Sequence, residues 1–185
     1  MKEKSPEFEY MLIKKIKHGD KSAFGQLLHL YNSRVYGYFY RTFGRREIVQ
    51  DLFQETFLRV WQSFHKFDVN RSFAAWVFTI ADRVRIDALR SGSVRMAVAS
   101  VEHLEYPGDD NPEEQLQTNE LRNQIEEAVK LLPEKQRRVF LLRQQAELPY
   151  KEIAGIMNEP LNSVLSHMHY AVKKLRTILK VNYEA

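Results

Sequence analysis

The stretch YKEIAGIMNEPLNSVLSHMHYAVKKL, from Tyr150 to Leu175, contains two apolar patterns separated by Asn158, Glu159 and Pro160. On both sides of this break, apolar residues recur at steps of three and four, as they do along one face of a helix. Two short helices joined by such a turn predict a helix-turn-helix, in which the second helix enters the major groove of DNA. An ordinary helical hairpin that closes a small core is the alternative interpretation.

The two sides of the second predicted helix differ in character. Its inner stripe contains Val164, Ala171 and Leu175, and Asn162 or Ser163 is placed to cap its first turn. The other side chains point away from this stripe: Leu165, Ser166, His167, His169, Tyr170 and Lys173. Basic residues in and around the pair are suited to phosphate contacts: Arg137, Arg138, Lys151, Lys173, Lys174 and Arg176.

The rest of the chain is also helical in pattern. No segment of useful length alternates apolar and polar residues as a half-buried strand does. We therefore expect an all-α protein, with helices over residues 7–17, 21–42, 46–64, 73–90, 119–132 and 134–145 before the final pair. Between residues 93 and 118 the periodicity fades, and YPGDDNP (residues 106–112) places two prolines and a glycine among acids. This segment is predicted to be a flexible acidic linker between two small helical domains.

Charge is distributed unevenly along the chain. Residues 1–99 contain 17 Lys and Arg against 10 Asp and Glu, residues 100–134 contain 2 against 10, and residues 135–185 contain 9 against 4. Two basic lobes therefore flank an acidic middle, although the formal net charge is only +4. Basic lobes attract polyphosphates such as nucleic acid. Solvated helix faces would explain the same charges without a ligand.

Composition disfavours several classes of function. The chain has no cysteine, and its six histidines form no metal-ligand pattern, so neither a metal nor a cofactor is expected. No glycine-rich phosphate loop or nucleophile–base pairing is visible, so we do not expect an enzyme. Met1 is followed by charged residues, and no run of about 18 apolar residues occurs. We therefore expect a cytoplasmic protein without membrane insertion.

The segment DLFQETFLRVWQSF, residues 51–64, has two different faces. An aromatic ridge with steps of four and three is expected to lie in the core: Phe53, Phe57, Trp61 and Phe64. A second and mostly polar face contains Asp51, Gln54, Glu55, Leu58 and Gln62. Such a face is usually solvated, but it is also suited to docking another helix.

The helix predicted over FAAWVFTIADRVRIDALR, residues 73–90, has a side away from its apolar stripe that carries Trp76, Arg83 and Arg90. An aromatic ring beside arginines is the combination that stacks a nucleobase and holds its phosphates. A half-buried tryptophan covered by arginine stems is the more common arrangement. The polar loop HKFDVNR, residues 65–71, precedes this helix and could line a pocket for one unstacked base.

Three motifs, taken in order, resemble the extracytoplasmic-function sigma factors of bacteria. The first is D-x-x-Q-E-x-F-x-x-x-W, which begins at Asp51. The second, beginning at Phe73, is F-x-x-W followed by I-A and D-x-L-R. The third runs from L-P at Leu132, through Y-x-E-I-A and S-V-x-S, to K-K-L-R ending at Arg176. Together the motifs cover nearly the whole chain apart from the linker.

The resemblance implies an RNA polymerase sigma factor in which residues 1–92 are region 2, residues 93–118 are the linker and residues 119–185 are region 4. It implies three partners: core RNA polymerase through its β and β′ subunits, promoter DNA, and an anti-sigma factor. The implied polymerase contacts are Asp51, Gln54, Glu55 and Leu58. The implied contacts to the melted downstream promoter element are Phe64, His65, Lys66, Phe67, Arg71, Trp76, Arg83 and Arg90. The implied contacts to the duplex upstream element are Arg137, Arg138, Tyr150, Lys151, Ser163, Leu165, Ser166, His167, His169 and Lys173.

The chain departs from the family pattern at positions that bear on DNA contacts. Asp82-Arg83 stands where the family often has Arg-Asn, Leu165 replaces a frequent lysine, and His167 replaces a frequent arginine. Arginine can bind guanine with two hydrogen bonds, whereas histidine usually makes one and leucine makes only apolar contacts. We therefore expect an upstream element that is chosen by fewer charged contacts.

Two other functions are compatible with the residues. A conventional transcription regulator would bind duplex DNA tightly through the helix-turn-helix alone, whereas a sigma factor binds weakly until core polymerase is added. An anti-sigma or adaptor protein would use its helix faces for protein partners only. This adaptor function is disfavoured because basic residues suited to DNA phosphates occur in and near the helix-turn-helix: Arg137, Arg138, Lys173 and Lys174.

Overall fold

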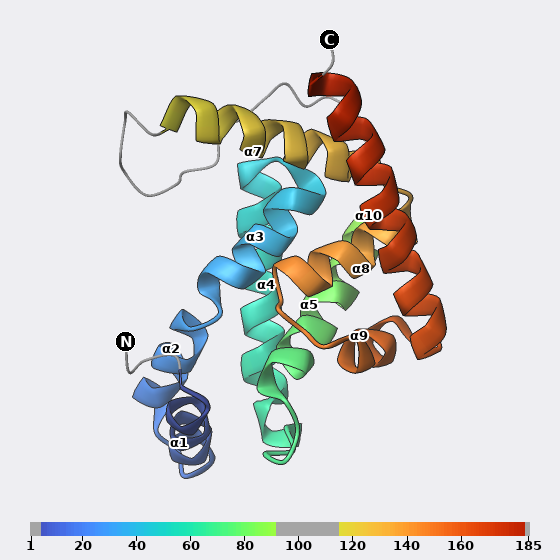
Figure 1. Cartoon of the computed structure of the whole chain (residues 1–185). Helices are drawn as coiled ribbons and strands as arrows, with labels where there is room; N and C mark the ends of the chain where they lie inside the picture. The colour runs from blue at the N-terminus through green and yellow to red at the C-terminus, as the bar shows by residue number, and fades with distance from the viewer. Residues whose placement is uncertain (1–4, 92–114, 184–185) are drawn as a thin grey trace. The chain divides into compact units, whose positions relative to one another are not determined.

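The computed structural model describes residues 5–91 and 115–183, and within these ranges the chain consists of helices, turns and loops with no strand (Figure 1). The all-α class predicted from the sequence is confirmed. The chain forms two compact units that divide between residues 99 and 100. The linker expected over residues 93–118 lies outside the described residues as far as residue 114.

Local sequence signals explain several of the helix ends in the first unit. Its helices are α1 (Pro6–Lys17), α2 (Lys21–His29), α3 (Asn32–Phe43), α4 (Arg46–Ser63) and α5 (Phe73–Arg90), with a 3₁₀ turn, Phe64–Lys66, after α4. The side chains of Ser5, Asp20 and Ser72 accept hydrogen bonds from first-turn amides of α1, α2 and α5. Gly44 ends α3 at a φ of 70°, a left-handed conformation that glycine adopts without steric cost.

One predicted helix is wrong: residues 21–42 form two helices, α2 and α3, which meet at Leu30 and Tyr31. The Tyr31 ring is 2% exposed and packs edge-on against Phe73, with ring centroids 5.3 Å apart. The Tyr31 hydroxyl donates a hydrogen bond to the carboxylate of Glu9 on α1. These tertiary contacts stabilise a change of chain direction that apolar spacing alone does not indicate.

The aromatic ridge of α4 is only partly buried. Phe57 and Phe64 lie in the core and Phe53 is half-buried, because α4 packs between α3 and α5. Trp61 is different: its side chain is 43% exposed, and its ring meets Phe24 of α2 edge-on at 4.6 Å between centroids. The prediction that Trp61 is a core residue is therefore wrong. The ring lies at the rim of the core and leaves one side to solvent.

The interior of the first unit also contains a buried ion pair. Asp82 and Arg85, both on α5, are 1% and 2% exposed. The Asp82 carboxylate accepts hydrogen bonds from Arg85 Nε at 3.1 Å and from the Tyr38 hydroxyl at 2.7 Å. A buried charge is tolerated only when it is paired and hydrogen-bonded. The cluster therefore joins α3 to α5 and restricts the rotation of α5 about its own axis.

The second unit is a small helical domain built on its last helix. Its helices are α7 (Gln115–Lys130), α8 (Glu134–Gln144), α9 (Tyr150–Met157) and α10 (Leu161–Tyr183). α10 packs against α7, α8 and α9. Its core contains fully buried aliphatic residues: Val139, Leu142, Leu148, Ile153 and Val164. α7 begins four residues before the start predicted at Asn119.

The turn between α9 and α10 is closed by backbone hydrogen bonds. Asn158 adopts a left-handed conformation with a φ of 54°, and the Glu159 N–H donates to the Ala154 carbonyl at 3.1 Å. This pattern is typical of a helix C-terminus, where a residue of positive φ satisfies the last carbonyls. The backbone on both sides of Glu159 is therefore well defined.

The start of α10 differs from the prediction. The Pro160 carbonyl accepts from the N–H groups of Ser163 and Val164 at 3.0 and 3.2 Å, so the helix begins at Leu161. The prediction that Asn162 or Ser163 caps α10 is therefore wrong, since both residues lie inside its first turn.

Removing the buried carboxylate should destabilise the first unit strongly. Asp82→Ala removes the buried carboxylate that Arg85 Nε contacts at 3.1 Å, and breaking a buried ion pair costs about 3–5 kcal/mol. Tyr38→Phe removes one hydrogen bond to a charged group and should cost roughly 1.5–3 kcal/mol. The free energy of unfolding is measured by urea titration with tryptophan fluorescence, because both tryptophans, Trp61 and Trp76, lie in this unit.

The control for this experiment is Asp87→Ala on the same helix. Asp87 forms its ion pair with Arg59 at the surface, 3.3 Å away, with a side chain that is 58% exposed. Exposed pairs of this kind contribute roughly 0–1 kcal/mol. Equal losses for Asp82→Ala and Asp87→Ala would contradict a structural role for the buried cluster.

Candidate nucleic-acid and protein interfaces

The outward face of α4 contains the residues proposed from the sequence for protein docking. Asp51 and Gln54 are exposed, and Leu58 is 51% exposed although it is aliphatic. Glu55 is half-buried, and its carboxylate accepts a hydrogen bond from Arg59 Nε at 2.7 Å. The exposed ring of Trp61 lies three residues beyond Leu58 and extends this face. Exposed apolar side chains on an otherwise polar face make this side of α4 a candidate for protein docking.

Three of the aromatic residues expected to contact DNA face the interior of the first unit. Phe64 and Phe67 are 5% and 3% exposed, and Trp76 is half-buried. The Trp76 ring lies 5.0 Å from Phe67 and 6.1 Å from Phe64 between centroids. Phe73 closes the same cluster. In this structure the faces of Phe64 and Phe67 are covered, so they support the loop and do not offer a stacking surface.

The loop that follows α4 is held by a residue that the sequence analysis did not single out. Lys17, at the end of α1, donates from Nζ to the carbonyl oxygens of Phe64 and His65, both at 3.3 Å. Its ammonium group also lies 5.6 Å from the centroid of the Phe64 ring. A cation is favourable where a helix ends in unsatisfied carbonyls. The sequence shows that α1 ends in lysines, but it does not show that this end lies beside the loop after α4.

Polar candidates of the first unit are exposed around this loop and along α5. His65, Lys66, Arg71, Arg83 and Arg90 all lie at the surface. Lys66 and Arg83 line one groove of about 360 Å³, together with Arg59, Gln62, Ser63 and Ile80. Arg71 and Arg90 do not line this groove, and Arg71 pairs with Asp68 at 3.6 Å. The groove presents several cationic groups close together, as a bound phosphate requires.

Asp82 and Arg83 have opposite environments despite being neighbours. Asp82 is buried against Tyr38, whereas Arg83 is exposed at the groove. Of these two neighbouring residues, only the arginine is exposed to a ligand in this structure.

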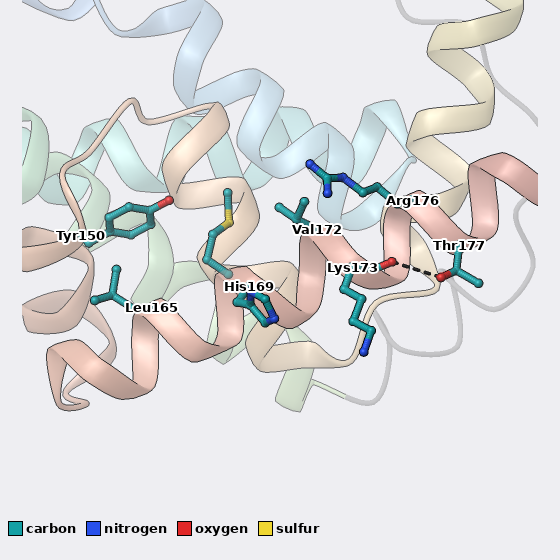
Figure 2. A pocket seen from close by; sticks show the side chains of 8 residues that line it. Tyr150, Leu165, His169, Val172, Lys173, Arg176 and Thr177 are labelled. Carbon is teal, nitrogen blue, oxygen red and sulfur yellow. Dashed lines mark hydrogen bonds between the residues drawn. The ribbon is translucent and has the colours of Figure 1, made fainter.

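In the second unit, a groove follows the outward side of α10. It measures about 560 Å³ and includes Leu165, His169 and Lys173 at successive turns, with Tyr150 of α9 at one end and Arg176 at the other (Figure 2). Leu165 is 41% exposed. Arg143 lies 5.2 Å from the centroid of the Tyr150 ring and adds positive charge near that end. The groove is amphipathic and basic, which suits contact with DNA.

Further candidates lie on α9 and α10 outside the lining of this groove. Lys151 and Ser166 are exposed, while Ser163 is half-buried in the first turn of α10. Tyr170, which was left out of the expected DNA contacts, is 55% exposed and meets His169 edge-on at 5.5 Å between ring centroids. Its outward position was visible in the sequence from the spacing of α10, and an exposed aromatic on that helix is a candidate contact.

Two arginines expected to meet phosphates are engaged within the second unit. Arg137 donates to Glu134 at 3.0 Å and to the Lys130 carbonyl at 3.3 Å, and only 21% of its side chain is exposed. Arg138 donates to the carbonyl of Ile156, near the end of α9, at 3.3 Å. Both side chains brace neighbouring helices. Lys151 and Lys173 are the more accessible cations near α10.

His167 belongs to a three-residue cluster at the helix-turn-helix turn. Glu159 Oε2 lies 3.0 Å from His167 Nε2, and Glu159 Oε1 lies 2.8 Å from Lys135 Nζ on α8. The Glu159 side chain is only 16% exposed and that of His167 25%. The Lys135 hydrogen bond, helped by that of His167 and opposed by burial, lowers the pKa of Glu159. The carboxylate is therefore ionised at neutral pH.

The described part of the chain gives two further findings. None of its helices is both long and apolar enough to cross a membrane. Among those residues, no group of three or more His, Cys, Asp or Glu side chains is arranged to hold a metal ion.

Two family models match the chain, one in each half. Sigma-70 region 2 matches residues 27–94, and Sigma-70, region 4 matches residues 122–175. The chain is 32% identical to the ECF RNA polymerase sigma factor SigW of Bacillus subtilis over 177 residues, which are 91% of this chain and 95% of SigW. It is 29% identical to the ECF RNA polymerase sigma factor RpoE of Cereibacter sphaeroides over 163 residues, 86% of this chain and 87% of RpoE.

Two solved structures have a similar fold. CnrH, solved in complex with the cytosolic domain of CnrY, gives a TM-score of 0.70 at 21% identity, covering 94% of this chain and 97% of CnrH. The sigma factor RpoE of Bartonella quintana, solved with the anti-sigma factor NepR, gives 0.67 at 20% identity, covering 85% of this chain and 97% of RpoE.

Loss of the Lys17 contacts should loosen the loop after α4. Lys17→Met keeps the aliphatic stem but removes both hydrogen bonds to the loop carbonyls, worth about 0.5–1.5 kcal/mol. Hydrogen exchange of amides 65–71, followed by mass spectrometry, should become roughly two- to tenfold faster. Lys15→Met, an exposed lysine on the same helix, serves as the control. Unchanged exchange in Lys17→Met would show that the loop is held by its aromatic cluster alone.

The pKa of Glu159 should rise when its main partner is removed. In Lys135→Met the carboxylate loses the hydrogen bond that contributes most to its lowered pKa. Because the folded pKa lies below the unfolded one, Glu159 stabilises the native state above the unfolded pKa. This contribution is lost as the pH falls through the folded pKa. Carbon-13 NMR titration of the Glu159 carboxyl group measures the shift. An identical titration in both proteins would exclude Lys135 as its cause.

Proposed function

Because the chain belongs to the ECF RNA polymerase sigma factors, we propose that its two units divide the work of promoter recognition between a melted strand and an intact duplex. Residues 1–92 act as region 2, residues 93–118 as the connecting linker and residues 119–185 as region 4. The family matches at residues 27–94 and 122–175, one in each compact unit, support these boundaries. The protein binds core RNA polymerase and directs it to promoters for initiation.

The outward face of α4 is proposed as the surface that docks on core polymerase. Asp51, Gln54, Glu55 and Leu58 supply its polar and apolar contacts, and we add Trp61 on the basis of its exposure. Burying Leu58 and Trp61 against a partner would remove apolar area from water, which is the main favourable term in association. The flanking carboxylates then give the contact its orientation.

The loop after α4 and the outer side of α5 are proposed to bind the melted downstream promoter element. His65, Lys66, Arg71, Arg83 and Arg90 are the exposed contacts, and the groove between Lys66 and Arg83 is suited to phosphates of a single strand. Phe64, Phe67 and Trp76 shape the loop from beneath, with the half-buried Trp76 closest to the surface. Capture of an unstacked base there offsets an unstacking cost of about a few kcal/mol per step.

The second unit is proposed to read the upstream element as duplex. α10 enters the major groove with Ser163, Leu165, Ser166, His167, His169 and Tyr170 toward the bases. Tyr150, Lys151 and Lys173 contact the backbone from both sides of the helix, while Arg137 and Arg138 support the unit from within. Few of these side chains are charged, which is why the upstream element is expected to be read through fewer ionic contacts.

Two individually weak DNA contacts become effective when polymerase holds them at a fixed span. Once one unit has bound, the second contact forms at high effective concentration, so total affinity rises without new surface. The protein needs no catalytic residue or cofactor of its own, since the polymerase carries the chemistry. It acts in the cytoplasm, where polymerase and DNA are found. An anti-sigma factor is the expected regulatory partner, as in the complex of RpoE with NepR.

The observation that carries this proposal is the presence of both sigma regions, in order, in a chain that matches SigW over 95% of the SigW length. A conventional regulator would explain the helix-turn-helix but not the exposed Leu58 and Trp61 of the first unit. It would also bind duplex DNA tightly without polymerase.

Run-off transcription from a randomised promoter library, with bacterial core polymerase and with or without this protein, tests the proposal. Specific starts that depend on the protein are expected.

Leu58→Glu should reduce polymerase binding at least tenfold in a pull-down, about 1.4 kcal/mol or more, because it places a charge in an apolar contact. Met11→Glu, an exposed apolar residue of α1, is the matched control. Absence of protein-dependent starts, with a folded protein, would reject the function.

A further inference from the structure

The cluster at the helix-turn-helix turn constrains how His167 can act. Glu159 is in the turn, Lys135 is on α8 and His167 is in the second turn of α10, so the cluster links three parts of the unit. Each Glu159 oxygen has its own partner, Lys135 Nζ at 2.8 Å and His167 Nε2 at 3.0 Å. The turn backbone around Glu159 is itself closed by hydrogen bonds. The carboxylate therefore holds the imidazole from a fixed point.

The chemistry of this contact decides which ring nitrogen carries hydrogen. An ionised carboxylate only accepts hydrogen bonds, so the His167 nitrogen facing it, Nε2, must be the protonated one. In the neutral imidazole the remaining nitrogen, Nδ1, is then an acceptor. In the major groove an acceptor pairs with an amino group, which adenine presents at N6 and cytosine at N4. Guanine offers acceptors in the same groove and would not pair with it.

We propose that Glu159 is a positioning residue that directs the Nε2–H of His167 into the protein and so leaves Nδ1 to select adenine or cytosine in the upstream element. This inference rests on the proposed function of α10 as the duplex reader. It assigns specificity to a turn residue that need not touch a base.

Lys135 has a separate role in this arrangement. A carboxylate beside a DNA-reading helix would repel phosphates, and the Lys135 ammonium, 2.8 Å from Glu159 Oε1, offsets that charge. Removal of the ammonium group should weaken binding to all DNA sequences alike, whereas loss of the Glu159 carboxylate should change which sequences are preferred. The two substitutions therefore distinguish the effect of the charge of Lys135 from the positioning of His167 by Glu159.

The test uses holoenzyme assembled from the full chain and bacterial core polymerase. It selects bound duplexes from a DNA library randomised over both promoter elements, and the bound pool is sequenced. Wild type should enrich adenine or cytosine over guanine and thymine on one strand at one upstream position, because the amino group then lies at one place in the major groove. Glu159→Gln, whose amide can donate or accept and so no longer fixes the tautomer, should reduce that preference about three- to tenfold. Lys135→Met should lower affinity uniformly and keep the order of preference.

A double-mutant cycle distinguishes positioning from a merely structural role. His167→Ala should remove the same preference, and adding Glu159→Gln to His167→Ala should then change it no further. Glu127→Gln is the matched control, because Glu127 forms its ion pair with Lys130 on α7, outside the turn. Unfolding of each variant is followed in parallel.

The possible outcomes are distinct. An unchanged preference in Glu159→Gln, or an equal change with and without His167, overturns the inference. If wild-type holoenzyme enriches no upstream motif at all, the proposed duplex-reading function fails, and with it the premise of the inference.

Discussion

The buried carboxylate of Asp82 is the constraint on which the first unit depends most directly. It accepts hydrogen bonds from Tyr38 on α3 and Arg85 on α5, in an interior where an unpaired charge would cost several kcal/mol. The apolar residues Val77, Ala81 and Val84 are buried on the same helix, while Arg83 is exposed at the groove that it shares with Lys66. The buried polar contact and the apolar stripe of α5 are therefore consistent with one orientation of the helix, in which Arg83 is offered to a ligand.

The second unit uses internal polar contacts in the same way. Arg137 and Arg138 hold α8 to the ends of α7 and α9, and Glu159 ties the turn to α8 and α10. A domain of this size has a small core, so hydrogen bonds and ion pairs between helices add a useful fraction of its stability. The consequence for function is that part of the positive charge near α10 supports the fold and is withdrawn from DNA.

In both units, therefore, the residues that stabilise the fold differ from the residues that are exposed to a ligand. In the first, an aromatic cluster of Phe64, Phe67, Phe73 and Trp76 lies beneath a loop whose exposed residues are polar. In the second, buried aliphatic residues lie beneath a helix whose outward side carries Leu165, His169 and Tyr170. A rigid base under a small set of exposed side chains limits the entropy lost when a ligand is bound.

The sequence by itself determined the all-α class, most helix positions and the family, because apolar spacing and capping residues act within a few neighbouring positions. It also located the helix-turn-helix and the outward face of α4. Only the tertiary structure decided that α2 and α3 are separate helices and that Trp61 is exposed. It also decided that the side chains of Arg137, Arg138 and Asp82 form hydrogen bonds within the protein. Periodicity shows which side chains share a face of a helix. Whether that face meets another helix, a buried charge or solvent depends on contacts between residues far apart in the chain, and these form only in the folded protein.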